Sequence, residues 1–297
     1  MKKKLKILQD IKRKKYYNYN MSSSLISKSP KIILEELKQK PLIKQRTPEW
    51  FKLREDRLTA SDLYDAIKNP LSLAKKKIKA ISYNSNAIPA LKWGTMFEPM
   101  ATRIYSIMNN KQVFEFGLII NDNIPNFGAS PDGITEDGVM IEIKCPYKRK
   151  IIDGEIPEKY YYQIQGQLAV CQLFNCDYIE CEFECYNNEY DYLSNTNNLE
   201  NYKHGIIAEN KIDYSYIYSK EKQSALENIN EMNSYLNDNN YRLNYWSLKL
   251  INIQKVEYNS NKWDNEILPK INNFYNIYIN EKKNKEKPID LFILDDD

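Results

Sequence analysis

The chain has 297 residues, of which 42% are hydrophobic and 28% are charged, as is usual for a globular protein. Its net charge of +3 is too small to indicate a nucleic-acid partner by itself. No apolar run approaches the roughly 20 residues of a membrane-spanning helix. The lysine-rich start also lacks the apolar stretch of a secretory signal. We therefore expect a soluble intracellular protein with no membrane partner.

The chain has one histidine, His204, and five cysteines without CxxC spacing. A single imidazole excludes metal sites and phosphohydrolase sites that need several histidines. Any metal is expected to be held by oxygen, which favours hard ions such as Mg²⁺ or Mn²⁺. The cysteines are expected to be reduced, with Cys181 and Cys185 on a half-buried strand; a zinc or iron–sulfur site is the less favoured alternative.

Residues 1–40 are read as a basic extension that need not be ordered, apart from a short helix at 32–40. The segment 48–68 predicts two helices, the second of them capped by Thr59-Ala60-Ser61-Asp62. Apolar residues at helical spacing then predict a helix at 93–108, with Glu98 off its apolar set.

The rest of the chain alternates between strands and helices. Patterning predicts strands at 113–120, 127–134 and 139–144, a helix at 159–174, strands at 178–185 and 246–258, and a helix at 263–281. The polar segment at about 187–240 is read as an insertion, and 286–297 as an acidic tail. The expected fold is α/β (α+β), with a central mixed β-sheet flanked by helices in one domain at 41–285.

The stretch 128–146 contains a predicted β-hairpin with Asp137-Gly138 at its turn. The length of the loop decides which side chains meet. A two-residue turn pairs Asp132 with Ile143 and places Asp132 and Glu142 on opposite faces. A three-residue loop with a left-handed glycine instead pairs Asp132 with Glu142, about 5 Å apart between their Cβ atoms.

The second register brings two acids and an amine together. Strand alternation places Glu142 and Lys144 on one face and their isoleucine neighbours in the core. Like charges opposed across two strands are destabilising unless a cation lies between them. Carboxylates that hold a divalent metal beside a cation suit phosphodiester hydrolysis. The same pattern also fits an ordinary exposed strand, so the surrounding motifs must decide.

Four ordered blocks surround this pattern. They are Arg46-Thr47-Pro48-Glu49-Trp50 through Leu58-Thr59-Ala60-Ser61, Trp93-Gly94-Thr95 with Phe97-Glu98-Pro99, Ser130-Pro131-Asp132-Gly133 with Glu142-Ile143-Lys144-Cys145-Pro146, and Tyr160 with Tyr162-Gln163-Ile164-Gln165-Gly166-Gln167. Together they resemble the lambda-exonuclease-like, or YqaJ viral recombinase, family of PD-(D/E)xK nucleases. The resemblance covers about 45–185, and faintly 246–280. It implies a restriction-endonuclease-like core.

The resemblance implies a catalytic metal centre. Asp132 and Glu142 would bind Mg²⁺ or Mn²⁺ together with the carbonyl of Ile143. Glu98 would complete the metal binding or the electrostatics. Lys144 would orient or activate the attacking water and stabilise the pentavalent phosphorus.

Further residues would position the reactants. By the same resemblance Gln163 would orient the lysine or the water, while Arg54 and Ser61 would hold a terminal 5′-phosphate. The run Lys148-Arg149-Lys150 follows the catalytic strand, where DNA backbone would pass. The alternative is that Glu98 and Gln163 are ordinary polar helix residues and that Arg54 is a surface ion-pair partner.

The function implied is a divalent-metal-dependent exonuclease that hydrolyses double-stranded DNA, 5′ to 3′, in recombination or DNA processing. An endonuclease on the same core and a non-catalytic DNA-binding scaffold are the alternatives. The resemblance also suggests a single-strand annealing protein as partner and a homo-oligomeric ring. For a viral protein, the compartment would be the cytoplasm or the nucleus of a host cell.

Overall fold

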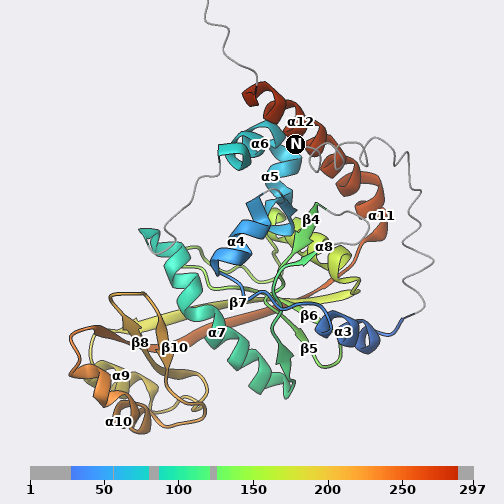
Figure 1. Ribbon diagram of the computed structural model, residues 1–297. Coiled ribbons are helices and arrows are strands. Elements are labelled where there is room, and N and C mark those ends of the chain that lie inside the picture. Colours follow the sequence, from blue (N-terminus) through green and yellow to red (C-terminus); the bar gives the residue numbers. More distant parts are fainter. Residues whose placement is uncertain (1–27, 56, 80–86, 121–125, 287–297) are drawn as a thin grey trace, which may run out of the picture.

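The computed structural model describes residues 28–55, 57–79, 87–120 and 126–286 (Figure 1). Most of the predicted basic extension and nearly all of the acidic tail therefore lie outside the described residues. No helix in the described ranges is long and apolar enough to cross a membrane.

A seven-stranded mixed sheet forms the centre of the fold (Figure 1). Its strands, in spatial order, are β2 (Val113–Phe114), β5 (Gly133–Thr135), β6 (Met140–Lys144), β7 (Asn175–Tyr186), β10 (Tyr241–Glu257), β8 (His204–Asn210) and β9 (Tyr216–Tyr218). β6 and β7 run parallel, and the other neighbouring strands described in this sheet pair antiparallel. The predicted fold class is confirmed.

A small second sheet lies beside the first and consists of β1 (Leu58–Thr59), β4 (Phe127–Ala129) and β3 (Ile119–Ile120). The single strands predicted at 113–120 and 127–134 are therefore wrong, because each is divided between the two sheets. The second break falls at Ser130-Pro131-Asp132, where proline has no N–H to donate to a ladder. This break releases Asp132 from regular strand geometry.

Helices surround the sheets. They are α3 (Pro30–Lys38), α4 (Pro48–Glu55), α5 (Leu63–Lys68), α6 (Pro70–Lys79), α7 (Pro89–Asn109), α8 (Glu158–Cys171), α9 (Glu189–Thr196), α10 (Ala225–Leu236), α11 (Ser260–Lys262) and α12 (Leu268–Glu286). A 3₁₀ turn (Ala60–Asp62) precedes α5, and a π-helical turn (Trp263–Ile267) precedes α12. The short helix predicted at 32–40 is present as α3, and the two helices predicted at 48–68 are present as α4 and α5. The helices predicted at 93–108, 159–174 and 263–281 are present as α7, α8 and α12.

The two faces of the main sheet carry different helices. The isoleucines of β6, Ile141 and Ile143, belong to the hydrophobic cluster that contains the buried side of α7. Met140 points to the opposite face and belongs to the cluster that contains α8, α5 and α12. Because side chains alternate along β6, Glu142 shares the face of Met140 and lies under α8.

The segment 187–240 contains α9, β8, β9 and α10. Its strands extend the main sheet through the pairing of β8 with β10. Buried Glu209 forms ion pairs with Lys92 of α7 and with Arg242 of β10. The hydroxyl of Tyr218 also donates to the Met96 carbonyl at 3.1 Å. The segment therefore contacts the helix that carries Glu98.

Candidate active site

The hairpin between β5 and β6 has the three-residue loop. Ile134 pairs with Met140 and Gly133 with Ile141. If this register is continued by one residue beyond the start of β5, Asp132 falls opposite Glu142. The Thr135 amide donates to the Val139 carbonyl at 2.8 Å, and Gly138 has a φ of +81°. The structure therefore selects the register that brings the two acids together.

Asp132 lies just before β5, and its carboxylate accepts the amide of Ile143 at 2.6 Å. Burial raises the pKa of this carboxyl well above its usual range. The negative charges of Glu142 and Glu98 raise it further, against the opposing effect of Lys144. The charged form of Asp132 is thus disfavoured, and a neighbouring cation would favour it.

Glu142 is fully buried, and both of its carboxylate oxygens are hydrogen-bonded. Gln163 donates to Oε1 at 2.6 Å, and Gln167, one turn further along α8, donates to Oε2 at 2.7 Å. Lys144 forms an ion pair with Oε1. The sequence interpretation included Gln163 but missed Gln167, although their spacing of four residues places them on one helix face.

Lys144 is held as an ammonium group. Burial alone lowers its pKa, but the carboxylates of Glu142 and Asp132 raise it above the usual lysine value. Its Nζ atom also lies 4.9 Å from the centre of the Tyr160 ring. A charged lysine in this position can donate to a phosphate oxygen or a water but cannot accept a proton.

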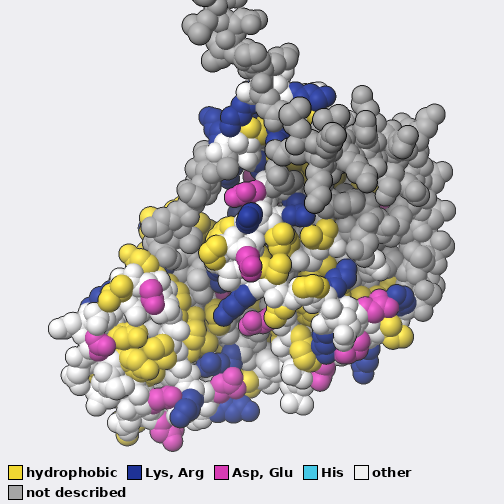
Figure 2. All heavy atoms as spheres, in the orientation of Figure 1, with side chains coloured by type: hydrophobic (Ala, Val, Ile, Leu, Met, Phe, Trp, Pro, Cys, Tyr) yellow, Lys and Arg dark blue, Asp and Glu magenta, His cyan; other side chains and the backbone are white. Residues whose placement is uncertain are grey.

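Glu98 comes from α7 and forms an ion pair with Arg46 at 2.6 Å. Arg46 has a φ of +65°, in the left-handed region that a non-glycine residue rarely adopts. The sequence did not indicate a role for Arg46, because no local pattern links it to Glu98, which lies 52 positions further along the chain. Figure 2 shows acidic and basic side chains close together in the middle of the drawn face, near α4.

Arg54 and Ser61 meet as predicted. The Arg54 Nη2 atom donates to Ser61 Oγ at 3.1 Å and to Thr59 Oγ1 at 3.2 Å. The guanidinium carbon lies 4.1 Å from the centre of the Trp50 ring. This ring and the 3₁₀ turn fix the guanidinium beside an exposed hydroxyl, an arrangement that suits a phosphate.

The basic run after β6 is not uniform. Arg149 forms an ion pair with fully buried Glu180 on β7. Lys148 and Lys150 are exposed, and the Lys148 Nζ lies 5.3 Å from the centre of the Tyr147 ring. One member of the run is therefore held in place, whereas Lys148 and Lys150 form no ion pair with any residue that the structure describes.

The donor set fits a hard divalent cation. In the described part of the chain, no three acidic, histidine or cysteine side chains already form a metal cage. Glu142 is occupied by Lys144 and two amides, and Glu98 by Arg46. The available ligands are nevertheless all oxygens, and a divalent cation would offset the repulsion that Glu142 and Glu98 exert on buried Asp132.

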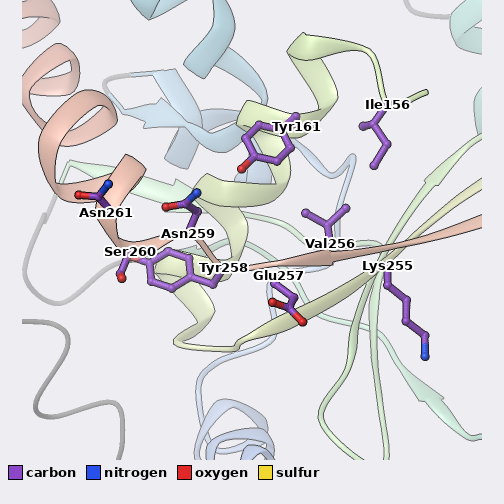
Figure 3. A pocket seen from close by; sticks show the side chains of 9 residues that line it. All are labelled: Ile156, Tyr161, Lys255, Val256, Glu257, Tyr258, Asn259, Ser260 and Asn261. Carbon is purple, nitrogen blue, oxygen red and sulfur yellow. The ribbon is translucent and has the colours of Figure 1, made fainter. Parts of the chain in front are cut away.

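A pocket of about 410 Å³ lies elsewhere, at the end of β10 (Figure 3). Tyr161, Tyr258 and Asn259 contribute to its wall. The Asn259 side chain already accepts the Lys262 amide at 2.8 Å. None of the predicted site residues lines this pocket, so it does not define the candidate active site.

Residues 49–173 match the model of the YqaJ-like viral recombinase domain. This part of the chain is similar to YqaJ-like viral recombinase domains. It contains all the residues predicted to form the site, and Gln167 as well. Arg46 and Glu180, which contact two of those residues, lie just outside the matched range.

The matched region and its surroundings also resemble known proteins. An uncharacterized protein of Acanthamoeba polyphaga mimivirus is 27% identical over 309 residues, which cover 86% of this chain and 56% of that protein. The chain thus spans about half the length of this curated relative. The crystal structure of an alkaline exonuclease, LHK-Exo, from Laribacter hongkongensis superposes with a TM-score of 0.51 and 21% identity, covering 80% of this chain and 96% of the exonuclease.

A structure of LHK-Exo in complex with dAMP gives the same TM-score of 0.51, with 22% identity and the same coverage of 80% and 96%. At this level of identity, the likeness establishes the fold. It agrees with the mixed sheet and flanking helices described above.

Proposed function

We propose that the chain is a divalent-metal-dependent nuclease that hydrolyses double-stranded DNA from 5′ ends. The observation that carries the proposal is the hairpin between β5 and β6, where Asp132 accepts the Ile143 amide and buried Glu142 forms an ion pair with Lys144. The YqaJ-like domain match and the fold shared with an alkaline exonuclease support it.

In this proposal Asp132, Glu142 and the Ile143 carbonyl hold the metal, with Glu98 beside them. A bound divalent ion would polarise the phosphate and lower the pKa of a water. The protein's own groups do the remaining work. Lys144, kept protonated by the carboxylates, donates to the phosphate as negative charge develops on it.

Two amides keep Glu142 in place during this step. Gln163 and Gln167 each bind one carboxylate oxygen, which fixes the rotation of the buried side chain. Gln163 is half-buried, whereas Gln167 is fully buried. We therefore assign the positioning of Glu142 to both glutamines.

Arg54 and Ser61 supply the preference for a 5′ end. Their contact leaves the exposed Ser61 hydroxyl beside a fixed guanidinium. A terminal phosphate has more charge and one more free oxygen than an internal phosphodiester, and a guanidinium recognises it well. Entry from a phosphorylated 5′ end follows from this pairing.

The test is digestion of linear duplex DNA labelled at either the 5′ or the 3′ end, with and without Mg²⁺ or Mn²⁺. We expect metal-dependent release of 5′ nucleotides and no cleavage of a covalently closed circle. Cleavage of the circle would favour the endonuclease alternative. Glu142→Ala should bind DNA without cutting it, whereas equal residual cleavage would place the activity at another site.

The role in recombination or DNA processing, an annealing partner and a ring-shaped oligomer stay predictions. A non-catalytic DNA-binding scaffold is less favoured, because Lys144 forms an ion pair with Glu142 and the Asp132 carboxylate binds the amide of Ile143 on the same strand.

A further inference from the structure

A second buried acid lies next to the candidate active site. Glu180 on β7 pairs in register with Lys144 on β6, so both side chains share the face under α8. Glu180 is fully buried. The Tyr178 hydroxyl donates to its Oε1 atom at 2.8 Å, and Arg149 forms an ion pair with the same oxygen. Among the described residues, Oε2 has no hydrogen-bond partner.

Arg149 is held on the other side by an aromatic ring. Its guanidinium carbon lies 5.8 Å from the centre of the Tyr160 ring. The amines of Lys144 and Lys159 lie 4.9 and 4.5 Å from the same centre. Three cations therefore surround one half-buried tyrosine, and the side chain of Arg149 remains 38% exposed.

Such an arrangement is costly for folding alone. A carboxylate loses much hydration free energy when it is buried, and an ion pair recovers this only in part. An apolar residue at position 180 would avoid the cost. Glu180 does, however, hold the Arg149 guanidinium in one position. Without this ion pair, the Arg149 side chain would sample several rotamers in solvent.

We propose that Glu180 is a positioning residue that fixes Arg149 beside Lys144, so that the exposed edge of the guanidinium binds a backbone phosphate of duplex DNA. This inference rests on the proposed function. Within the basic run, Arg149 makes the fixed contact with a DNA phosphate. Lys148 and Lys150 contribute only a diffuse electrostatic attraction to the DNA. Tyr178 and Tyr160 complete the support of the guanidinium.

The experiment measures equilibrium binding of a short duplex by fluorescence anisotropy, without divalent metal, at several salt concentrations. Simple electrostatics predicts that Glu180→Gln binds DNA more tightly, because a negative charge is removed. Positioning predicts the opposite. We expect roughly tenfold weaker binding and a salt slope smaller by about one, as for one lost phosphate contact.

The matched control is Glu182→Gln on the same strand, whose partner is Lys249 at 3.0 Å. It removes the same charge and should bind DNA as the wild type does, or slightly more tightly. Arg149→Met should reproduce the loss seen in Glu180→Gln. The double variant should be no weaker than Arg149→Met, because both changes remove one contact.

Thermal melting checks that each variant is folded. If Glu180→Gln does not fold, Tyr178→Phe replaces it, since this change keeps the carboxylate and removes one donor to it. Only about a two- to threefold loss of affinity is expected there, less than a full hydrogen bond to a charged group, because the ion pair between Glu180 and Arg149 is retained.

Wild-type affinity and slope in Glu180→Gln, or in Tyr178→Phe where that variant replaces it, would overturn the inference. The inference would also be overturned if the double variant lost roughly a further tenfold in affinity relative to Arg149→Met alone. Binding is measured without cleavage, so the two proposals can fail separately. A protein that binds DNA through Arg149 but never cuts it contradicts only the nuclease proposal. A protein that cuts DNA normally with an unaffected Glu180→Gln variant contradicts only the positioning role.

Discussion

Gln167 donates its amide hydrogen to the inner oxygen of Glu142, at 2.7 Å, across the buried space between α8 and β6. This bond leaves Lys144 and Gln163 to share the other oxygen. The position of the buried acid is therefore set mainly from the helix side of the sheet.

Replacing Gln167 by leucine should impair both stability and catalysis. The change leaves Oε2 of Glu142 buried without a donor, which costs about 1–3 kcal/mol of unfolding free energy. We expect kcat to fall roughly tenfold or more, as for other residues that orient a metal ligand. Denaturant unfolding and single-turnover cleavage measure the two effects. Gln254→Leu, at a surface glutamine that donates to Glu155, is the control; equal behaviour of the two variants would contradict the role of Gln167.

Asp132→Asn should abolish cleavage while stabilising the metal-free protein. The folded-state pKa of Asp132 is raised, so its charged form destabilises the fold at pH values above that pKa. We expect a gain of about 1 kcal/mol at neutral pH. The gain should shrink as pH falls through the raised pKa, because the wild-type carboxyl then becomes neutral. Melting curves from pH 4 to 8 without metal test this, and a constant difference between the proteins would refute it.

Arg54→Ala should reduce the distinction between phosphorylated and hydroxyl 5′ ends. The wild type should degrade 5′-phosphorylated duplex faster, because the guanidinium is fixed against Trp50 and Ser61. We expect roughly a hundredfold loss on phosphorylated ends, on the scale of a charged contact removed from a bound phosphate. Rates on hydroxyl ends should change little. Lys52→Ala, an exposed lysine of the same helix, should retain the preference.

Arg46→Asn should strengthen divalent metal binding. The change removes the cation that neutralises Glu98, while asparagine tolerates the left-handed backbone at this position. Because an exposed ion pair contributes little, we expect only about threefold tighter Mn²⁺ binding by calorimetry. Lys44→Ala removes an exposed charge nearby along the chain and serves as the control. Weaker binding in Arg46→Asn would show that the arginine supports the metal site rather than competing with it.

The hairpin could be predicted because its signals are local. Asp137-Gly138 marks the turn, and alternation along β6 fixes which side chains share a face. The sequence left two loop lengths open, and the left-handed Gly138 resolves them. Arg54 with Ser61 could also be predicted, although only through the family resemblance.

Contacts between distant segments could not be predicted in this way. Arg46, in the loop before α4, reaches Glu98 on α7. Glu180 on β7 reaches Arg149 in the segment that follows the neighbouring strand β6. Neither pair leaves a periodic signal in the sequence. The helix α6 was missed because its lysines resemble a solvated run, although Leu73 and Ala74 are buried. The strand divisions at 115–118 and 130–132 depend on which sheet each half joins, which is a tertiary choice.

The tip of the hairpin has little freedom to vary. A Cβ atom at Gly138 would lie 2.7 Å from the Pro30 carbonyl carbon, where α3 begins, so that helix covers the turn. Nine residues separate Asp132 from Glu142, and an odd insertion or deletion among them would turn one acid toward α7 and the other toward α8. Counting this interval thus offers a simple screen for which related chains can still assemble an acidic pair.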